Sequence, residues 1–84
     1  MQVTFTQHAL ARMADRGISR AEVLATLEHP LRTIDVQNGR QEAQGWIERM
    51  GRRQLLRVIY ENGVVVMVVT VMATSKIEKY GVQP

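Results

Sequence analysis

QLLRVIYENGVVVMVVTVM, residues 54–72, is the stretch of this chain that decides the predicted fold. Two runs rich in β-branched and apolar residues flank Asn62-Gly63, a dipeptide that favours the two central positions of a type I′ turn. The sequence therefore predicts an antiparallel hairpin with a two-residue loop. In that register Tyr60 lies opposite Val65.

The two faces of this predicted hairpin differ, because successive strand residues point to opposite sides of a sheet. One face carries Leu56 and Val58 and is wholly apolar, which is typical of a core. The other face carries Arg57 and Thr70 among apolar residues. We expect the functional residues to lie on this second face.

Size and composition favour one globular domain, residues 1–84, with a small core. Cysteine is absent, which excludes disulfides and thiolate metal sites. The formal net charge is +3, and arginine supplies most of the positive charge. Arginine suits bidentate contact with phosphate, so the charge favours a polyanionic partner, with a solvated basic surface as the alternative. No stretch is typical of a signal peptide or a membrane span, and a cytoplasmic protein is expected.

The N-terminal third predicts two helices joined by a sharp turn. Thr6 is placed to cap a helix over residues 7–16, and Gly17 fits the position after its end. Ser19 and Glu22 have capping-box spacing for a second helix, which Pro30 ends.

The remainder predicts strands over about residues 31–37 and 44–50, followed by the hairpin. We therefore predict an α+β fold in which two N-terminal helices pack on one face of a four-stranded antiparallel meander sheet. Residues 40–45 are polar, and a mobile loop is the alternative there. Residues 73–84 are predicted to form a short helix or a flexible tail.

His8 and Arg12 form the sharpest candidate for chemistry, because a helix places them one turn apart on the same side. A neutral imidazole can take a proton from a hydroxyl, and a guanidinium can bind the phosphate under attack. That pair suffices for metal-free cleavage of RNA through its own 2′-OH. A surface histidine beside a solvated arginine is the alternative, and spacing alone favours it. No metal-binding motif is present, so no metal or other cofactor is expected.

Arg57 and Thr70 are the candidates on the hairpin. A cation in the middle of an apolar strand requires an open face or a charged partner. Arg57 is therefore either a phosphate clamp or half of an ion pair, with Glu48, Glu61 or Asp35 as partner. Thr70 can donate its hydroxyl to a phosphate, although threonine is also a common strand residue.

Further basic residues are candidates for contacts to a nucleic-acid backbone. Arg16 continues the helical row of His8 and Arg12, and a structural role at the helix junction is equally expected. Arg49, Arg52 and Arg53 cluster at a predicted tight turn, Met50-Gly51. They form either a phosphate-binding patch or a solvated loop.

Three segments in order, FTQHALARMADRGIS, EVLATLEHP and RRQLLRVIYENGVVVMVVTV, resemble a group of short prokaryotic and phage domains of unknown function. That group is similar to the RelE- and BrnT-like toxins, which are small metal-independent ribonucleases. The resemblance implies an antiparallel sheet with N-terminal helices. It also implies that His8, Arg12, Arg57 and Thr70 are the residues to test.

The leading hypothesis is a toxin-like, metal-independent endoribonuclease with RNA as substrate and a cognate antitoxin protein as partner. The alternative is a nonenzymatic nucleic-acid- or protein-binding accessory module, related to phage or to toxin–antitoxin systems. A third hypothesis is a homodimer formed through the apolar parts of the Arg57 face. The catalytic hypothesis requires that the basic row on the first helix and Arg57 open into one shared hollow.

Overall fold

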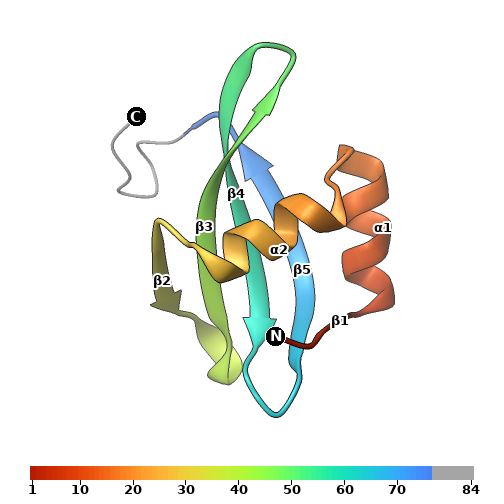
Figure 1. The fold of residues 1–84 in the computed structure, drawn as a ribbon, viewed down its shortest axis with the longest axis vertical. Coiled ribbons are helices and arrows are strands. Elements are labelled where there is room, and N and C mark those ends of the chain that lie inside the picture. The colour runs from red at the N-terminus through yellow and green to blue at the C-terminus, as the bar shows by residue number, and fades with distance from the viewer. Residues whose placement is uncertain (77–84) are drawn as a thin grey trace.

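Two helices cover one face of a five-stranded sheet in the computed structural model, which describes residues 1–76 (Figure 1). The chain runs through β1 (Val3–Phe5), α1 (Gln7–Arg16), α2 (Arg20–Glu28), β2 (Arg32–Asp35), a short 3₁₀ turn (Gln37–Gly39), β3 (Gln41–Arg49), β4 (Arg52–Glu61) and β5 (Val66–Thr74). The predicted α+β class is confirmed.

Both helices begin and end as the sequence predicts, because their capping residues act locally. The Thr6 hydroxyl accepts the Ala9 N–H at 3.0 Å and starts α1. Gly17 ends α1 in the left-handed region, with φ of 64°. Ser19 and Glu22 form the predicted capping box of α2.

The predicted number of strands was wrong, because β1 adds a fifth strand at the edge. The strand order is β1-β5-β4-β3-β2, and β1 pairs with β5 in parallel. Val3 and Phe5 pack against the core. A three-residue strand has too few positions to show an alternating pattern, so this segment could be predicted only as an extended lead-in.

The loop considered as the alternative for residues 40–45 is not found at residues 41–45, because β3 starts at Gln41, three residues before the predicted strand. Its side chains alternate between the two faces of the sheet. Gly45 faces α2, where a Cβ atom would lie 2.7 Å from the Thr26 hydroxyl oxygen. Glu42 and Gln44 point to the opposite face, where other polar side chains pair with them. The polarity of this strand therefore reflects its partners rather than exposure to water.

The predicted register of the β4–β5 hairpin was also wrong. Val58 pairs with Val71 and Glu61 with Met67, and a bulge lies between Ile59 and Tyr60. This register places Val71 in the core, where it is fully buried. Asn62-Gly63 consequently lies in a longer loop and does not adopt the positive φ of a type I′ turn.

At the centre of β4 the corrected pairing differs from the predicted one by an even number of residues, so the side-chain faces are preserved there. Beyond the bulge the difference is odd and the faces are exchanged, which places Val68 in the core together with Val71. Thr70 lies opposite Ile59, so it shares the Arg57 face, as the sequence predicts. β5 continues to Thr74, beyond the predicted strand end. The predicted helix or tail over the remaining residues to 84 lies largely outside the described part.

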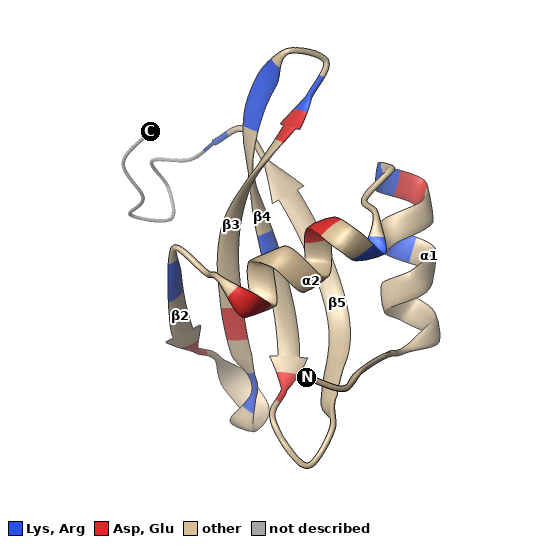
Figure 2. Ribbon diagram, viewed as in Figure 1, with Lys and Arg blue, Asp and Glu red and all other residues tan. Residues whose placement is uncertain are grey.

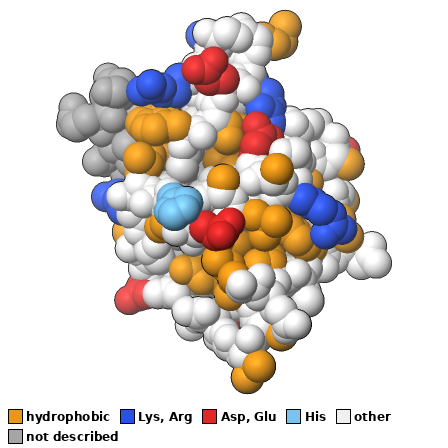
Figure 3. Space-filling model, viewed as in Figure 1, with side chains coloured by type: hydrophobic (Ala, Val, Ile, Leu, Met, Phe, Trp, Pro, Cys, Tyr) orange, Lys and Arg blue, Asp and Glu red, His pale blue; other side chains and the backbone are white. Residues whose placement is uncertain are grey.

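The core lies between the helices and the sheet. It joins Ala9 and Met13 of α1 and Val23 of α2 to Leu56, Val58 and Val71 of the sheet. Hydrophobic side chains also gather across the middle of the helical surface (Figure 3). Within residues 1–76, no helix has both the length and the apolar character needed to span a bilayer.

Candidate nucleic-acid interface

His8 and Arg12 lie on α1, beside the face that Ala9 and Met13 bury. The His8 side chain is exposed, and Arg12 is half-buried. The Nε atom of Arg12 is buried and has no hydrogen-bond partner among the described residues. An unpaired buried N–H of this kind costs about 1–3 kcal/mol. Within residues 1–76, the Nε atom of Arg12 is therefore a donor that lacks an acceptor.

Arg57 and Thr70 project from the opposite face of the sheet. Arg57 alternates with the core residues Leu56 and Val58, which face the helices. The sheet consequently lies between this pair and the His8–Arg12 pair. This arrangement is not the shared hollow that the catalytic hypothesis requires of all four residues.

Arg57 forms a bidentate ion pair with Glu42 on the neighbouring strand. Its Nε and Nη2 atoms each donate to a different carboxylate oxygen of Glu42, both at 2.9 Å. Burial raises the pKa of Glu42, but hydrogen bonds from Arg57 and Gln44 outweigh it, and the net pKa lies below the ordinary value. The ion-pair alternative drawn from the sequence was correct in kind, although it named Glu48, Glu61 or Asp35 as the partner.

A polar network continues from this ion pair across the sheet. The Gln44 amide donates to Glu42 at 2.7 Å, and Arg32 Nε donates to Gln44 at 2.9 Å. Glu42 and Gln44 are 1% and 0% exposed, so their hydrogen bonds replace water inside the protein. The network gives Arg57 a structural role.

Arg49 is likewise bound within the protein. It forms an ion pair with Glu22 of α2, and its Nη2 atom donates to the Gly17 carbonyl at 2.6 Å. The Arg49 hydrogen bond lowers the pKa of Glu22 to about 2, and the same contact raises the pKa of Arg49. Arg49 therefore ties the β3–β4 hairpin to the junction between α1 and α2.

This connection places the arginines at the tip of the β3–β4 hairpin near those that flank the α1–α2 junction (Figure 2). We call this group the basic end; its members are Arg16, Arg20, Arg49, Arg52 and Arg53. All except Arg49 are exposed. Arg53 lies over the Trp46 ring at 4.9 Å, and Arg20 lies over Phe5 at 4.8 Å.

Sequence reasoning identified most of the basic end but missed Arg20. Arg20 directly follows the N-cap Ser19, and the first turn of a capped surface helix is commonly open to solvent. Arg20 could have been identified from this position, which is four residues after Arg16 and on the other side of a sharp helix junction.

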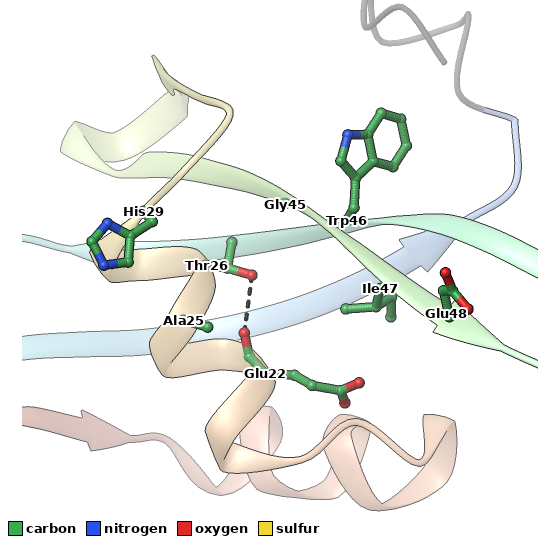
Figure 4. A pocket seen from close by; sticks show the side chains of 8 residues that line it. All are labelled: Glu22, Ala25, Thr26, His29, Gly45, Trp46, Ile47 and Glu48. Atoms are coloured by element: carbon green, nitrogen blue, oxygen red, sulfur yellow. Dashed lines mark hydrogen bonds between the residues drawn. The ribbon is translucent and has the colours of Figure 1, made fainter.

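A separate cavity of about 420 Å³ lies between α2 and the free edge of β3 (Figure 4). Its lining includes Glu22, Thr26 and His29 from the helix side, and Trp46 points away from it (Figure 4). None of the predicted catalytic residues lines this cavity. Within residues 1–76, no cluster of three His, Asp or Glu side chains is placed to hold a metal ion.

Fold and surface together define a small α+β domain with a basic end. The chain belongs to the DUF4258 family, described as a domain of unknown function, whose model matches residues 5–79. No curated protein and no solved structure matches the chain. The family match agrees with the predicted resemblance to a domain of unknown function and provides no link to RelE- or BrnT-like toxins.

Proposed function

We propose that this protein binds RNA through its basic end. The observation that carries the proposal is the gathering of exposed arginines where the β3–β4 hairpin meets the α1–α2 junction (Figure 2). Exposed guanidiniums on both faces of this end, with Arg53 over Trp46 and Arg20 over Phe5, attract a polyphosphate chain and release its counterions. The ion pair between Arg49 and Glu22 supports this geometry by holding the hairpin against the helices.

RNA is the polyanion we favour because of the resemblance to RelE- and BrnT-like ribonucleases. Arg57 has no part in this surface, since it lies in the buried network with Glu42. The binding proposal thus corresponds to the nonenzymatic alternative drawn from the sequence, with its contact residues now restricted to one end of the fold.

Fluorescence anisotropy of a labelled RNA, measured over a range of KCl concentrations, tests this proposal. The expected result is a linear fall of log K with log [KCl], with a slope that reflects several phosphate contacts. Binding that is absent or insensitive to salt would exclude the basic end as an RNA-binding surface.

A second candidate function, metal-independent cleavage of RNA at α1, is favoured by the unpaired Nε of Arg12. A phosphate oxygen would satisfy this buried donor, and His8 lies one helical turn away, near the N-terminus of α1. The positive end of a helix dipole also favours an anion there. His8 and Arg12 would then act without Arg57 and Thr70.

In this second proposal, His8 takes the proton from a ribose 2′-OH while Arg12 holds the adjacent phosphate. The 2′-oxygen bonds to phosphorus and the bond from phosphorus to the 5′-oxygen breaks. The products are a 2′,3′-cyclic phosphate and a 5′-hydroxyl, whose proton comes from water.

Incubation of labelled RNA in EDTA with the wild type and with His8→Ala tests the cleavage proposal. We expect product with a cyclic phosphate end from the wild type, and at least about a hundredfold less from His8→Ala. Equal cleavage by both proteins, or cleavage by neither, would remove it and leave RNA binding unaffected.

A further inference from the structure

The β3–β4 hairpin extends beyond the strands on both sides of it. β2 pairs with β3 only as far as Gln44, and β5 pairs with β4 only as far as Leu55. From there the two strands form a ribbon that closes at the pair Arg49–Arg52, and it projects from the sheet (Figure 1). Arg49 fixes the ribbon to α2, so its tip has a defined position.

Met50 lies at the tip of this ribbon, where both its exposure and its backbone conformation are unfavourable for a methionine. Its side chain is 99% exposed, and its backbone has φ of 53° in the turn that it forms with Gly51. Asn, Asp and Gly are the residues that such a turn favours, and other L-residues there cost about 1–2 kcal/mol. Neither turn propensity nor packing against any of the described residues explains a methionine at this position.

The surroundings of Met50 carry positive charge and an aromatic ring. Arg52 and Arg53 follow it directly and are exposed, and Arg53 covers one ring face of Trp46. Val64 provides a contrast, because it is equally exposed in the β4–β5 loop but has neither a positive φ nor arginine neighbours. The tip of the hairpin thus combines a single exposed apolar side chain with two guanidinium groups.

A nucleic acid fits this combination better than a membrane does. Methionine is among the side chains that minor-groove DNA-binding proteins insert as apolar wedges between base steps, and we extend this mode of contact to RNA. Flanking guanidiniums suit the phosphates on either side of such a step. One methionine supplies too little apolar surface to hold a protein on a bilayer. A base step, in contrast, offers an apolar contact of about the size of a single side chain.

We infer that the tip of the β3–β4 hairpin, residues 49–53, docks into a groove of folded RNA and places Met50 against an exposed base step. Arg52 and Arg53 bind the phosphates that flank this step. The inference rests on the proposed RNA binding and adds its contact residue and its substrate class, a structured RNA. It is independent of cleavage at α1.

Anisotropy with a 2′-O-methyl RNA stem-loop tests the inference, since this RNA cannot be cleaved through a 2′-OH. Met50→Asn is the decisive variant, because asparagine suits the left-handed turn and keeps the hairpin folded. We expect about tenfold weaker binding than the wild type, with the salt slope unchanged. Arg52→Gln should instead lower the salt slope by about one phosphate contact.

Two controls separate the outcomes. Val64→Asn removes an exposed apolar side chain at the opposite end of β4 and should bind like the wild type. Met50→Asn binding as tightly as the wild type would overturn the inference while leaving RNA binding intact. A wild type that fails to bind the RNA, or that binds phosphatidylserine vesicles through Met50 instead, would overturn both the inference and the proposed function.

Discussion

Arg57 and Glu42 form a two-point ion pair across β4 and β3, with both donor–acceptor distances at 2.9 Å. Glu42 is almost fully buried, and 19% of the Arg57 side chain is exposed. Removing one member of such a pair leaves a charge without its partner in a region with little water. The stability of the sheet therefore depends on Arg57.

Replacement of Arg57 by methionine should destabilise the protein by about 3–5 kcal/mol, because Glu42 loses its main partner. Urea denaturation measures the change. Arg40→Gln is the matched control, because Arg40 pairs with Glu61 at 3.4 Å in a more exposed setting worth at most about 1 kcal/mol. If both variants unfold at the same urea concentration, Arg57 does not have the structural role assigned to it.

The ion pair of Glu22 with Arg49 should make stability depend on pH in acid. The pKa of Glu22 falls from 4.5 to about 2 in the folded protein. In that window the unfolded chain binds the proton more readily, so the contribution of the pair is complete above about pH 4.5 and is lost as pH falls towards 2. The lowered pKa of Glu42 acts in the same direction.

Thermal unfolding between about pH 6 and pH 3 tests this dependence. Glu22→Gln should flatten the decline of the melting temperature, since glutamine retains the capping-box contact but has no charge to titrate. Glu28→Gln, on the exposed side of the same helix, is the control. Identical declines for the wild type and Glu22→Gln would contradict the assigned coupling.

Close contact between α2 and β3 makes Gly45 sensitive to a single added methyl group. A Cβ there would lie 2.7 Å from the Thr26 hydroxyl, which donates to the Glu22 carbonyl at 2.9 Å. Gly45→Ala should therefore cost about 1–3 kcal/mol in denaturant unfolding. Adding Thr26→Ala should recover part of that loss; a double variant that is less stable still would argue against this contact as the cause.

Arg12 should bind a simple anion through its buried, unpaired Nε. Inorganic phosphate at about ten times its dissociation constant should stabilise the wild type by about 1.4 kcal/mol, which raises the melting temperature by several degrees. Arg12→Met should lose this increase without destabilising the protein in phosphate-free buffer. Arg16→Met, an exposed neighbour on α1, should retain it. An equal increase in all three proteins would show that phosphate does not act through Arg12.

The sequence predicted those features that depend on neighbouring residues. Thr6, Gly17 and the Ser19–Glu22 capping box act within a few positions, and both helices follow them. The hairpin register depends instead on burying Val71 and on pairing with β1, which are contacts between distant segments. Asn62-Gly63 is a local signal that these distant contacts overrule.

The same distinction between local signals and contacts between distant segments applies to the candidate site. The spacing of His8 and Arg12 on one helix was predictable, whereas the position of Arg57 relative to them depended on which face the helices cover. Glu42 was missed as the partner of Arg57 because the predicted strand began only at about residue 44 and a mobile loop was the alternative for the polar residues before it. The sequence could have indicated a strand here, because Glu42 and Gln44 alternate with Ala43 and Gly45, and such alternation is typical of a strand with two different faces. Binding to RNA, binding to an antitoxin and formation of a homodimer stay predictions.

The most direct measurement of the central claim compares Arg53→Gln with Arg40→Gln for RNA binding at several salt concentrations. Each variant removes one positive charge, but the first lies at the basic end and the second beside Glu61 at the other end of the fold. We predict that Arg53→Gln binds RNA several-fold more weakly, with a salt slope lower by about one phosphate contact, and that Arg40→Gln binds like the wild type. Equal losses of affinity in the two variants would mean that RNA responds to net charge alone and not to this surface.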